Sequence, residues 1–298
     1  MRKLRVGLAL GGGAARGAAH IGILKVLESE NIPIHIITGT SIGAIIGAMY
    51  STHPKALEVE KRAREYIESP RFKFTQFGFL NKKKYSEKGS GFFYKFSHHI
   101  KKGIFYNLSL AKRSLISEEE LRRHIEALTD DIDIGETHLR FAATALDITT
   151  GSEFVFKTGP LRKAVSASCA IPGILPPIKV NGHELVDGGS IDLVPVRPAS
   201  ELGANLIIAV DVSKGIDGPF ELSCGIDVVI RADKITAHTL NQILIREADL
   251  VLKPDVQDVF WADFSKFDHC VQKGEKEANK KLDKIKRLLS KKRLTHWF

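Results

Sequence analysis

The stretch HIITGTSIGAIIGAMY, residues 35 to 50, decides how the fold of this chain is interpreted. Three β-branched residues after His35 are typical of a buried strand, and the run of Ala and Ile that ends at Tyr50 is typical of a buried helix. Between them stands Gly39-Thr40-Ser41-Ile42-Gly43, which has the form G-x-S-x-G. Glycines around a serine between a strand and a helix permit the sharp turn that exposes a nucleophilic hydroxyl. Ser41 is therefore a candidate nucleophile, and a helix-capping serine is the structural alternative.

A second glycine-rich loop follows the first expected strand, Leu4 to Leu10. Gly11-Gly12-Gly13 precedes Ala14-Ala15-Arg16-Gly17 and a helix expected from Ala18 to Glu30. Such a loop leaves main-chain N–H groups pointing outward at a helix N-terminus, where they bind negative charge. A dinucleotide fingerprint does not fit, because Ala14 or Arg16 occupies a required glycine position and no acid ends the second strand. The loop therefore predicts an anion site near Ser41, with a plain structural loop as the alternative.

Strands and helices alternate along most of the chain. Further strands are expected in LRFAATALD (139–147), GSEFVF (151–156), NLIIAV (205–210) and ADLVLK (248–253), and further helices over 42–50, 55–68, 121–128 and 226–246. In IKVNGHELVDGG (178–189), Asn181-Gly182 between two apolar arms predicts a β-hairpin. This alternation predicts the α/β class, with a mostly parallel sheet covered by helices on both faces.

Composition limits the classes of protein. The 298 residues, of which 43% are hydrophobic and 27% charged, are enough for one large domain or two small ones. The longest apolar run, 164–180, is interrupted by three prolines, so no stretch is long enough to cross a bilayer. The basic start MRKLRVGLALGGG reads as a strand and not as a signal peptide. Three isolated cysteines predict neither a disulfide framework nor a zinc site. We expect a soluble, cytoplasmic protein.

Residues 71–113 differ in composition from the rest of the chain. They hold eleven Lys or Arg, one acid and 11 of the 23 aromatic residues, whereas the whole chain carries a net charge of +9. Aromatic and cationic side chains together suit an anionic lipid interface, which predicts a cap or a patch that contacts the inner membrane surface. An insertion packed on itself is the alternative, and no motif supports nucleic-acid binding. A second basic stretch, 273–298, predicts a solvated amphipathic helix and tail.

A serine nucleophile needs a base. Asp187 ends the hairpin in LVDGG, where Gly188 and Gly189 let a carboxylate approach another loop closely. An Asp that only organises a turn is the alternative. In α/β-hydrolases an acid and then a histidine follow the serine, and His238 and His269 come late enough to serve. However, four strands normally precede that elbow, and the first 40 residues have room for two. A histidine-dependent esterase stays open as the enzymatic alternative.

Taken together, GGGAARG, GTSIGA and DGG resemble, in this order, the oxyanion loop, nucleophile elbow and catalytic aspartate of the patatin-like phospholipase family. The resemblance extends from about Val6 to Pro198. It is to the bacterial-type members of the family, and the chain is also similar to the catalytic domain of neuropathy target esterase. This resemblance implies one three-layer α/β/α domain over residues 1–298. It also implies a Ser41–Asp187 dyad that hydrolyses fatty acyl esters of phospholipids or lysophospholipids, with no histidine, cofactor or catalytic metal.

The resemblance assigns roles to the glycine loop as well. The N–H groups of Gly12, Gly13 and Ala14 would hold the developing oxyanion, and Arg16 would add charge or brace the loop. The family's G-x-G-x-x-G pattern, laid on residues 12–17, places Ala14 where a second glycine is usual, and a backbone N–H survives that change. A non-catalytic lipid-binding or partner-binding module on the same fold is the remaining alternative.

Overall fold

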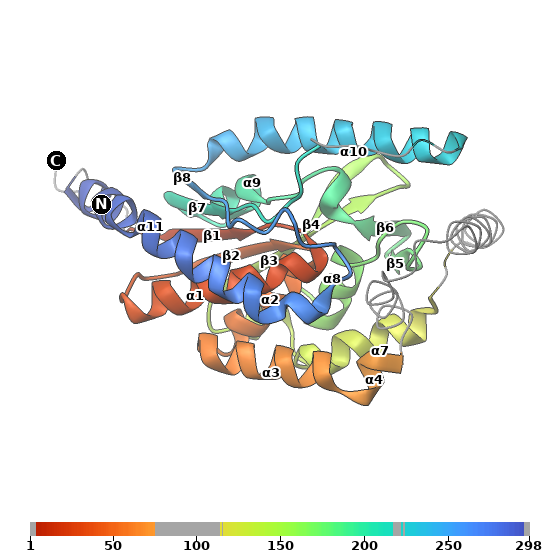
Figure 1. Cartoon of the computed structure of the whole chain (residues 1–298), viewed down its shortest axis with the longest axis horizontal. Coiled ribbons are helices and arrows are strands. Elements are labelled where there is room, and N and C mark those ends of the chain that lie inside the picture. The colour runs from red at the N-terminus through yellow and green to blue at the C-terminus, as the bar shows by residue number, and fades with distance from the viewer. Residues whose placement is uncertain (1–3, 75–113, 115, 217–221, 223, 295–298) are drawn as a thin grey trace, which may run out of the picture.

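The computed structural model describes residues 4–74, 114, 116–216, 222 and 224–294 (Figure 1). Its described strands form one sheet in the order β5-β6-β3-β2-β1-β7-β8, and β4 pairs with β3 outside this path. The strands are β1 (Val6–Leu10), β2 (Ile36–Thr40), β3 (Arg140–Asp147), β4 (Ser152–Phe156), β5 (Ile178–Val180), β6 (His183–Asp187), β7 (Leu206–Val210) and β8 (Leu250–Leu252).

The centre of the sheet is parallel, and one end is antiparallel. β3, β2, β1, β7 and β8 run parallel to one another, whereas β4 and β6 pair antiparallel with β3 and β5 pairs antiparallel with β6. Every residue of β1, β2 and β7 is buried, because a parallel strand is covered on both faces. The predicted mostly parallel sheet is therefore confirmed.

Helices lie on both faces of the sheet (Figure 1). α9 and α10 cover one face, and α1, α2, α8 and α11 lie on the other, with α3, α4 and α7 farther from the sheet on that side (Figure 1). The helices are α1 (Ala18–Ser29), α2 (Ile42–Thr52), α3 (Ala56–Glu68), α4 (Pro70–Phe74), α7 (Glu118–Leu128), α8 (Leu161–Ser168), α9 (Val196–Glu201), α10 (Gly225–Leu244) and α11 (Phe267–Leu294).

Two hydrophobic cores follow from the alternation of side chains along each strand. Leu8 and Leu10 of β1 belong to the core beneath α1 and α2, whereas Ala9 between them belongs to a smaller core beneath α9. In β2, Ile37 belongs to the core beneath α1 and α2, and Ile36 belongs to the core beneath α9. The sheet is thus the middle layer of a three-layer α/β/α architecture, as the resemblance implied.

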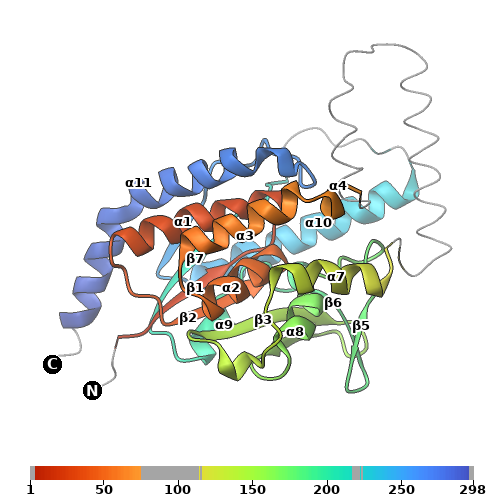
Figure 2. The same ribbon diagram turned by 90° about the horizontal axis from the view of Figure 1, so that it is seen from below.

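Helix α11 is more than a solvated helix at the end of the chain. It begins before residue 273 and packs along α1, and Figure 2 shows the two helices side by side. A Cβ built on Gly22 would lie 2.0 Å from the Val271 carbonyl oxygen, and one on Gly274 would lie 2.0 Å from that of Ala19. These glycines let the two backbones touch. The inner face of α11 is therefore part of the core, and its outer face carries the basic residues.

The basic, aromatic segment falls mainly outside the described residues, which stop at Phe74 and resume at residue 114. The interpretations given above for residues 71–113 stay predictions. In the described part of the chain, no helix combines the length and the apolar composition needed to span a bilayer.

Candidate active site

Ser41 stands at the sharp turn between β2 and α2. Its φ of 56° lies in the left-handed region, which a residue with a side chain rarely adopts and which costs free energy. A Cβ at Gly39 would lie 2.4 Å from the Gly43 carbonyl oxygen, and one at Gly43 would lie 2.0 Å from that of Leu10. Only glycine fits at these two positions. The Ser41 side chain makes no capping hydrogen bond to α2, so the helix-cap alternative is wrong.

Side-chain hydroxyls hold this turn in place. The Ser41 N–H donates to Ser168 Oγ at 2.9 Å, and Ser168 Oγ donates to the Thr144 carbonyl at 2.7 Å. Thr40 Oγ1 donates to the Asp192 carbonyl at 2.8 Å. The strained backbone of the turn is thus fixed by α8, β3 and the loop after β6. Sequence reasoning did not single out Ser168, because a serine near the end of a short helix carries no motif.

Asp187 is the last residue of β6 and is 8% exposed. The Ser41 hydroxyl donates a hydrogen bond to its carboxylate, and the Gly189 N–H donates to Asp187 Oδ1 at 2.8 Å. A Cβ at Gly188 would lie 2.6 Å from the Thr144 carbonyl oxygen, so glycine permits the close approach. The expected neighbours Ser41 and Asp187 are therefore together, although Asp187 also organises its own turn.

Burial controls the acidity of Asp187. It raises the pKa of the carboxyl group to about 6, against the opposing effect of the hydrogen bonds from Ser41 and Gly189. At neutral pH the group is therefore mostly ionised. It is also a stronger base than an exposed aspartate, because its conjugate acid is weaker.

The glycine loop passes beside Ser41. A Cβ at Gly12 would lie 3.4 Å from Ser41 Cβ. The Gly12 N–H, expected as an oxyanion donor, is used elsewhere because it donates to the Leu193 carbonyl at 3.0 Å. The N–H groups of Gly13 and Ala14 have no acceptor among the described residues. Ala14 has a φ of 50°, which explains why glycine is usual at this position.

Two buried side chains, Arg16 and His20, hold the glycine loop in place through hydrogen bonds to main-chain carbonyl groups. Arg16 donates from Nε to the Val212 carbonyl at 2.9 Å and from Nη1 to the Val259 carbonyl at 3.3 Å. Of the two roles expected for Arg16, adding charge at the oxyanion and bracing the loop, these hydrogen bonds support bracing. His20 Nε2 donates to the Gly11 carbonyl at 2.8 Å, and burial lowers the pKa of His20 to about 4, so the ring is neutral. His20 was missed from the sequence, because its partner is a main-chain atom.

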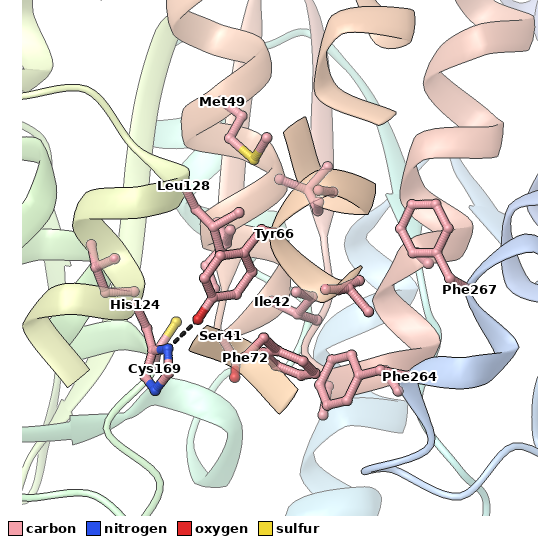
Figure 3. Close-up of a pocket in the computed structure, with 18 of the residues that line it drawn as sticks. Ser41, Ile42, Met49, Tyr66, Phe72, His124, Leu128, Cys169, Phe264 and Phe267 are labelled. Atoms are coloured by element: carbon pink, nitrogen blue, oxygen red, sulfur yellow. Dashed lines mark hydrogen bonds between the residues drawn. The ribbon is translucent and has the colours of Figure 1, made fainter. Parts of the chain in front are cut away.

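An apolar pocket of about 980 Å³, its open part included, extends from Ser41 (Figure 3). Helices α2, α3 and α7 supply half of its lining, and Ala14, Cys169 and Phe264 are among the residues that close other sides. None of the described residues that line it is Asp, Glu, Lys or Arg. The pocket therefore favours an alkyl chain over an ionised ligand.

The polar side chains inside the pocket are few. Tyr66 and His124 form a hydrogen bond with each other through the Tyr66 hydroxyl and His124 Nδ1 (Figure 3). Burial, aided by the charge of Arg71, lowers the pKa of His124 to about 4, so its ring is neutral. His238 and His269 are not among the described lining residues, whereas His124 is. His124, which sequence reasoning did not consider, is therefore a further histidine that a histidine-dependent mechanism could use.

Metal-ligating residues do not gather in the described part of the chain. No group of three or more His, Cys, Asp or Glu residues there is arranged to hold a metal ion. Cys169, Cys224 and Cys270 are all free thiols, and Cys169 lines the pocket. Burial and the charge of Asp187 raise the pKa of the Cys169 thiol well above its usual range. This thiol is therefore protonated and a poor nucleophile.

Comparisons with known proteins show the family of this chain. The family model of patatin-like phospholipases matches residues 8–200. Human patatin-like phospholipase domain-containing protein 6 is 32% identical over 209 residues, which are 70% of this chain and 13% of that protein. Lysophospholipase NTE1 of Scheffersomyces stipitis is 27% identical over 300 residues, 92% of this chain and 18% of that protein.

This chain thus spans less than a fifth of the length of these two relatives. Among solved structures, VipD from Legionella pneumophila aligns with a TM-score of 0.48 at 14% identity, over 94% of this chain and 67% of that one. The match of the family model covers well over half of the 298 residues. The chain therefore belongs to the patatin-like phospholipase family.

Proposed function

We propose that this chain is a serine acyl hydrolase that cleaves fatty acyl esters of phospholipids or lysophospholipids through Ser41 and Asp187. One observation carries the proposal: the hydroxyl of a serine at a strained turn donates to a buried carboxylate, and this serine lines an apolar pocket. Nucleophile, base and acyl-binding surface are then within reach of one ester carbonyl.

The reaction proceeds in two halves. Asp187 accepts the proton of the Ser41 hydroxyl as its oxygen attacks the ester carbonyl, and the N–H groups of Gly13 and Ala14 hold the oxyanion. The intermediate collapses, and Asp187 returns the proton to the leaving alcohol. A water molecule then gives a proton to Asp187 and attacks the acyl-serine, which releases the fatty acid and restores the Ser41 hydroxyl. Preorganised donors matter here, because a carboxylate is a weak base for a hydroxyl.

The pocket supports a fatty acyl substrate. Its lining offers alkyl and aromatic surface and no ionised side chain among the described residues, which suits a hydrocarbon chain and leaves a charged headgroup outside. The names of the relatives, phospholipase and lysophospholipase, support the same substrate class.

Lipid profiling tests the proposal. Purified protein is incubated with phosphatidylcholine and lysophosphatidylcholine, and released fatty acid is measured by mass spectrometry. Ser41→Ala and Asp187→Asn should each remove nearly all release, whereas His238→Ala and His269→Ala should retain most of it. His124→Ala should retain it as well, although its packing against Tyr66 is lost.

Two outcomes would replace the proposal. A histidine variant as inactive as Ser41→Ala, with a native fold, would establish a histidine-dependent esterase. Lipid binding without release of fatty acid from any substrate would establish a non-catalytic lipid-binding module.

A further inference from the structure

A pair of carboxyl groups, Asp192 buried and Glu153 half-buried, lies behind the nucleophile turn. Asp192 is 3% exposed and hydrogen-bonded through its side chain to Glu153 of β4. Asp192 Oδ1 and Glu153 Oε1 are both buried, and no N–H group or alcohol hydroxyl of the described residues donates a hydrogen bond to either oxygen. Two carboxyl groups in contact through buried oxygens cannot both be ionised without a large cost in free energy, so the pair retains one shared proton.

The nearby cations, Arg197 and Lys157, do not neutralise the pair in place of the shared proton. Arg197 of α9 is the cation that faces Asp192, but its guanidinium is engaged by Glu247, at 2.9 Å from Nε and 2.8 Å from Nη2. Lys157, which follows β4, faces Glu153, but it is paired with Glu201 at 2.6 Å. The positive charge of each of these cations is thus neutralised by a different carboxylate, Glu247 or Glu201.

The main chain beside Asp192 connects the parts of the active site. Residues 188–193, which we call the strap, begin directly after Asp187. The Asp192 carbonyl accepts the Thr40 hydroxyl next to Ser41, and the Leu193 carbonyl accepts the Gly12 N–H at 3.0 Å. The strap therefore contacts the nucleophile turn and the glycine loop. The pair between Asp192 and Glu153 adds an attachment of the strap to β4.

We propose that Asp192, sharing a proton with Glu153, is a positioning residue that holds the strap and thereby aligns Ser41, Asp187 and the glycine loop. The inference rests on the function proposed above. Asp192 touches no substrate and takes no part in proton transfer to Ser41. Its effect on the reaction is transmitted through the hydrogen bonds of the strap, and a small misplacement of reacting groups is enough to slow turnover.

A consequence is an upper pH limit for turnover. Burial and the negative charge of Glu153 raise the pKa of Asp192 to about 9. When the shared proton leaves, two negative charges repel each other in a buried site, and the strap loses its attachment to β4. We therefore expect kcat to fall as the pH rises through about 9.

Three variants test this role. Asp192→Asn replaces the carboxyl with a neutral group that still donates to Glu153, so kcat at pH 7 should stay close to native and the fall above pH 9 should disappear. Asp192→Ala removes the attachment, and kcat at pH 7 should drop by up to about a hundredfold with little change in KM. The control is Asp147→Asn, because Asp147 is also buried but is bonded to His183 and Thr150, away from the strap. Its alkaline limb should match that of the native chain.

Thermal unfolding provides a readout that does not depend on catalysis. The folded chain keeps the Asp192 proton up to about pH 9, whereas an unfolded aspartate loses it near pH 4. This residue therefore makes native stability fall as the pH rises from about 4 to 9. Asp192→Asn should flatten that dependence, and Asp147→Asn should not.

Different results would refute the role of Asp192 and the proposed hydrolase function. If Asp192→Asn shows the native alkaline limb and the native dependence of unfolding on pH, the inference is wrong. A native kcat in Asp192→Ala would overturn it as well, and if that variant does not fold, the Asn variant decides. If Ser41→Ala keeps native activity, the proposed function fails, whatever Asp192 does.

Discussion

Filling the far part of the pocket should change which acyl chains are cleaved. One face of α2 runs along the pocket from Ser41, which directly precedes the helix, and contributes Ile42, Ile45, Ile46 and Met49. With a rise of 1.5 Å per residue, Met49 lies about 12 Å from Ser41 along the helix axis. An acyl chain bound to Ser41 and lying on this face reaches Met49 only if it is long. Met49→Trp should therefore shorten the usable pocket.

The size of the effect follows from the apolar lining. Burying one methylene contributes about 0.8 kcal/mol, which is about fourfold in kcat/KM. If the indole displaces roughly two to three methylenes, the loss is about 2 kcal/mol, or about thirtyfold in kcat/KM for long-chain esters. Butyrate esters, which end well before Met49, should be cleaved at close to the native rate.

The assay is a series of p-nitrophenyl esters of increasing acyl length, kept below the concentration at which they aggregate. Leu57→Trp on α3 is the matched control, since Leu57 is 69% exposed and is not among the residues that line the pocket. Its chain-length profile should be native. An equal loss of kcat/KM for all chain lengths in Met49→Trp, or an unchanged profile, would refute the placement of the acyl chain along α2.

Three other predictions address the base, the loop and the basic segment. Because burial raises the pKa of Asp187 to about 6 and its ionised form accepts the Ser41 proton, kcat/KM should fall about tenfold per pH unit below pH 6; a flat profile from pH 4.5 to 8 would contradict this. Ala14→Gly should relieve the positive φ, raise stability by up to about 1 kcal/mol in denaturant unfolding and keep activity, and a large loss of kcat would count against Ala14 as a simple N–H donor. Replacing Lys82, Lys83 and Lys84, which lie outside the described residues, with Glu should weaken binding to anionic vesicles by about 1 kcal/mol for each engaged lysine. Hydrolysis of a soluble ester should persist, and unchanged vesicle binding would oppose the interfacial interpretation.

Strands of the central sheet were predictable from the sequence because burial on both faces produces continuous apolar runs. NLIIAV became β7, and LRFAATALD became β3 with its predicted partner β4. The hairpin was predictable for a local reason, since Asn181 and Gly182 adopt φ values of 48° and 88°, as a tight two-residue turn requires. In these regions local chemistry and the tertiary fold favour the same structure.

Two short helices could not be predicted in the same way. α8 begins at Leu161 and overlaps only the first residues of the apolar run 164–180, where no helix was predicted from the sequence. α9 has six residues and contains Pro198 in its first turns, so neither its length nor its composition gives a helical period. Both helices are fixed by packing against the sheet. α8 nevertheless supplies Ser168, which holds the nucleophile turn.

In the candidate site, too, the residues that stand in local motifs were predictable, whereas the contacts that depend on the tertiary fold were not. Ser41 and Asp187 stand in motifs whose glycines are required by close contacts, so their places could be inferred from sequence. The use of the Gly12 N–H by Leu193 could not, because it depends on where the strap crosses the loop. His20 was likewise hidden, since a buried histidine that braces a carbonyl has no sequence pattern of its own.

Covalent labelling of Ser41 tests the central claim most directly. The purified chain is treated with an alkyl fluorophosphonate, and intact-mass and peptide mass spectrometry locate the adduct. The account predicts one adduct per chain, on Ser41, with none on Ser41→Ala and much slower formation on Asp187→Asn. An adduct that persists at another residue in Ser41→Ala, or a folded native chain that forms none, would contradict it.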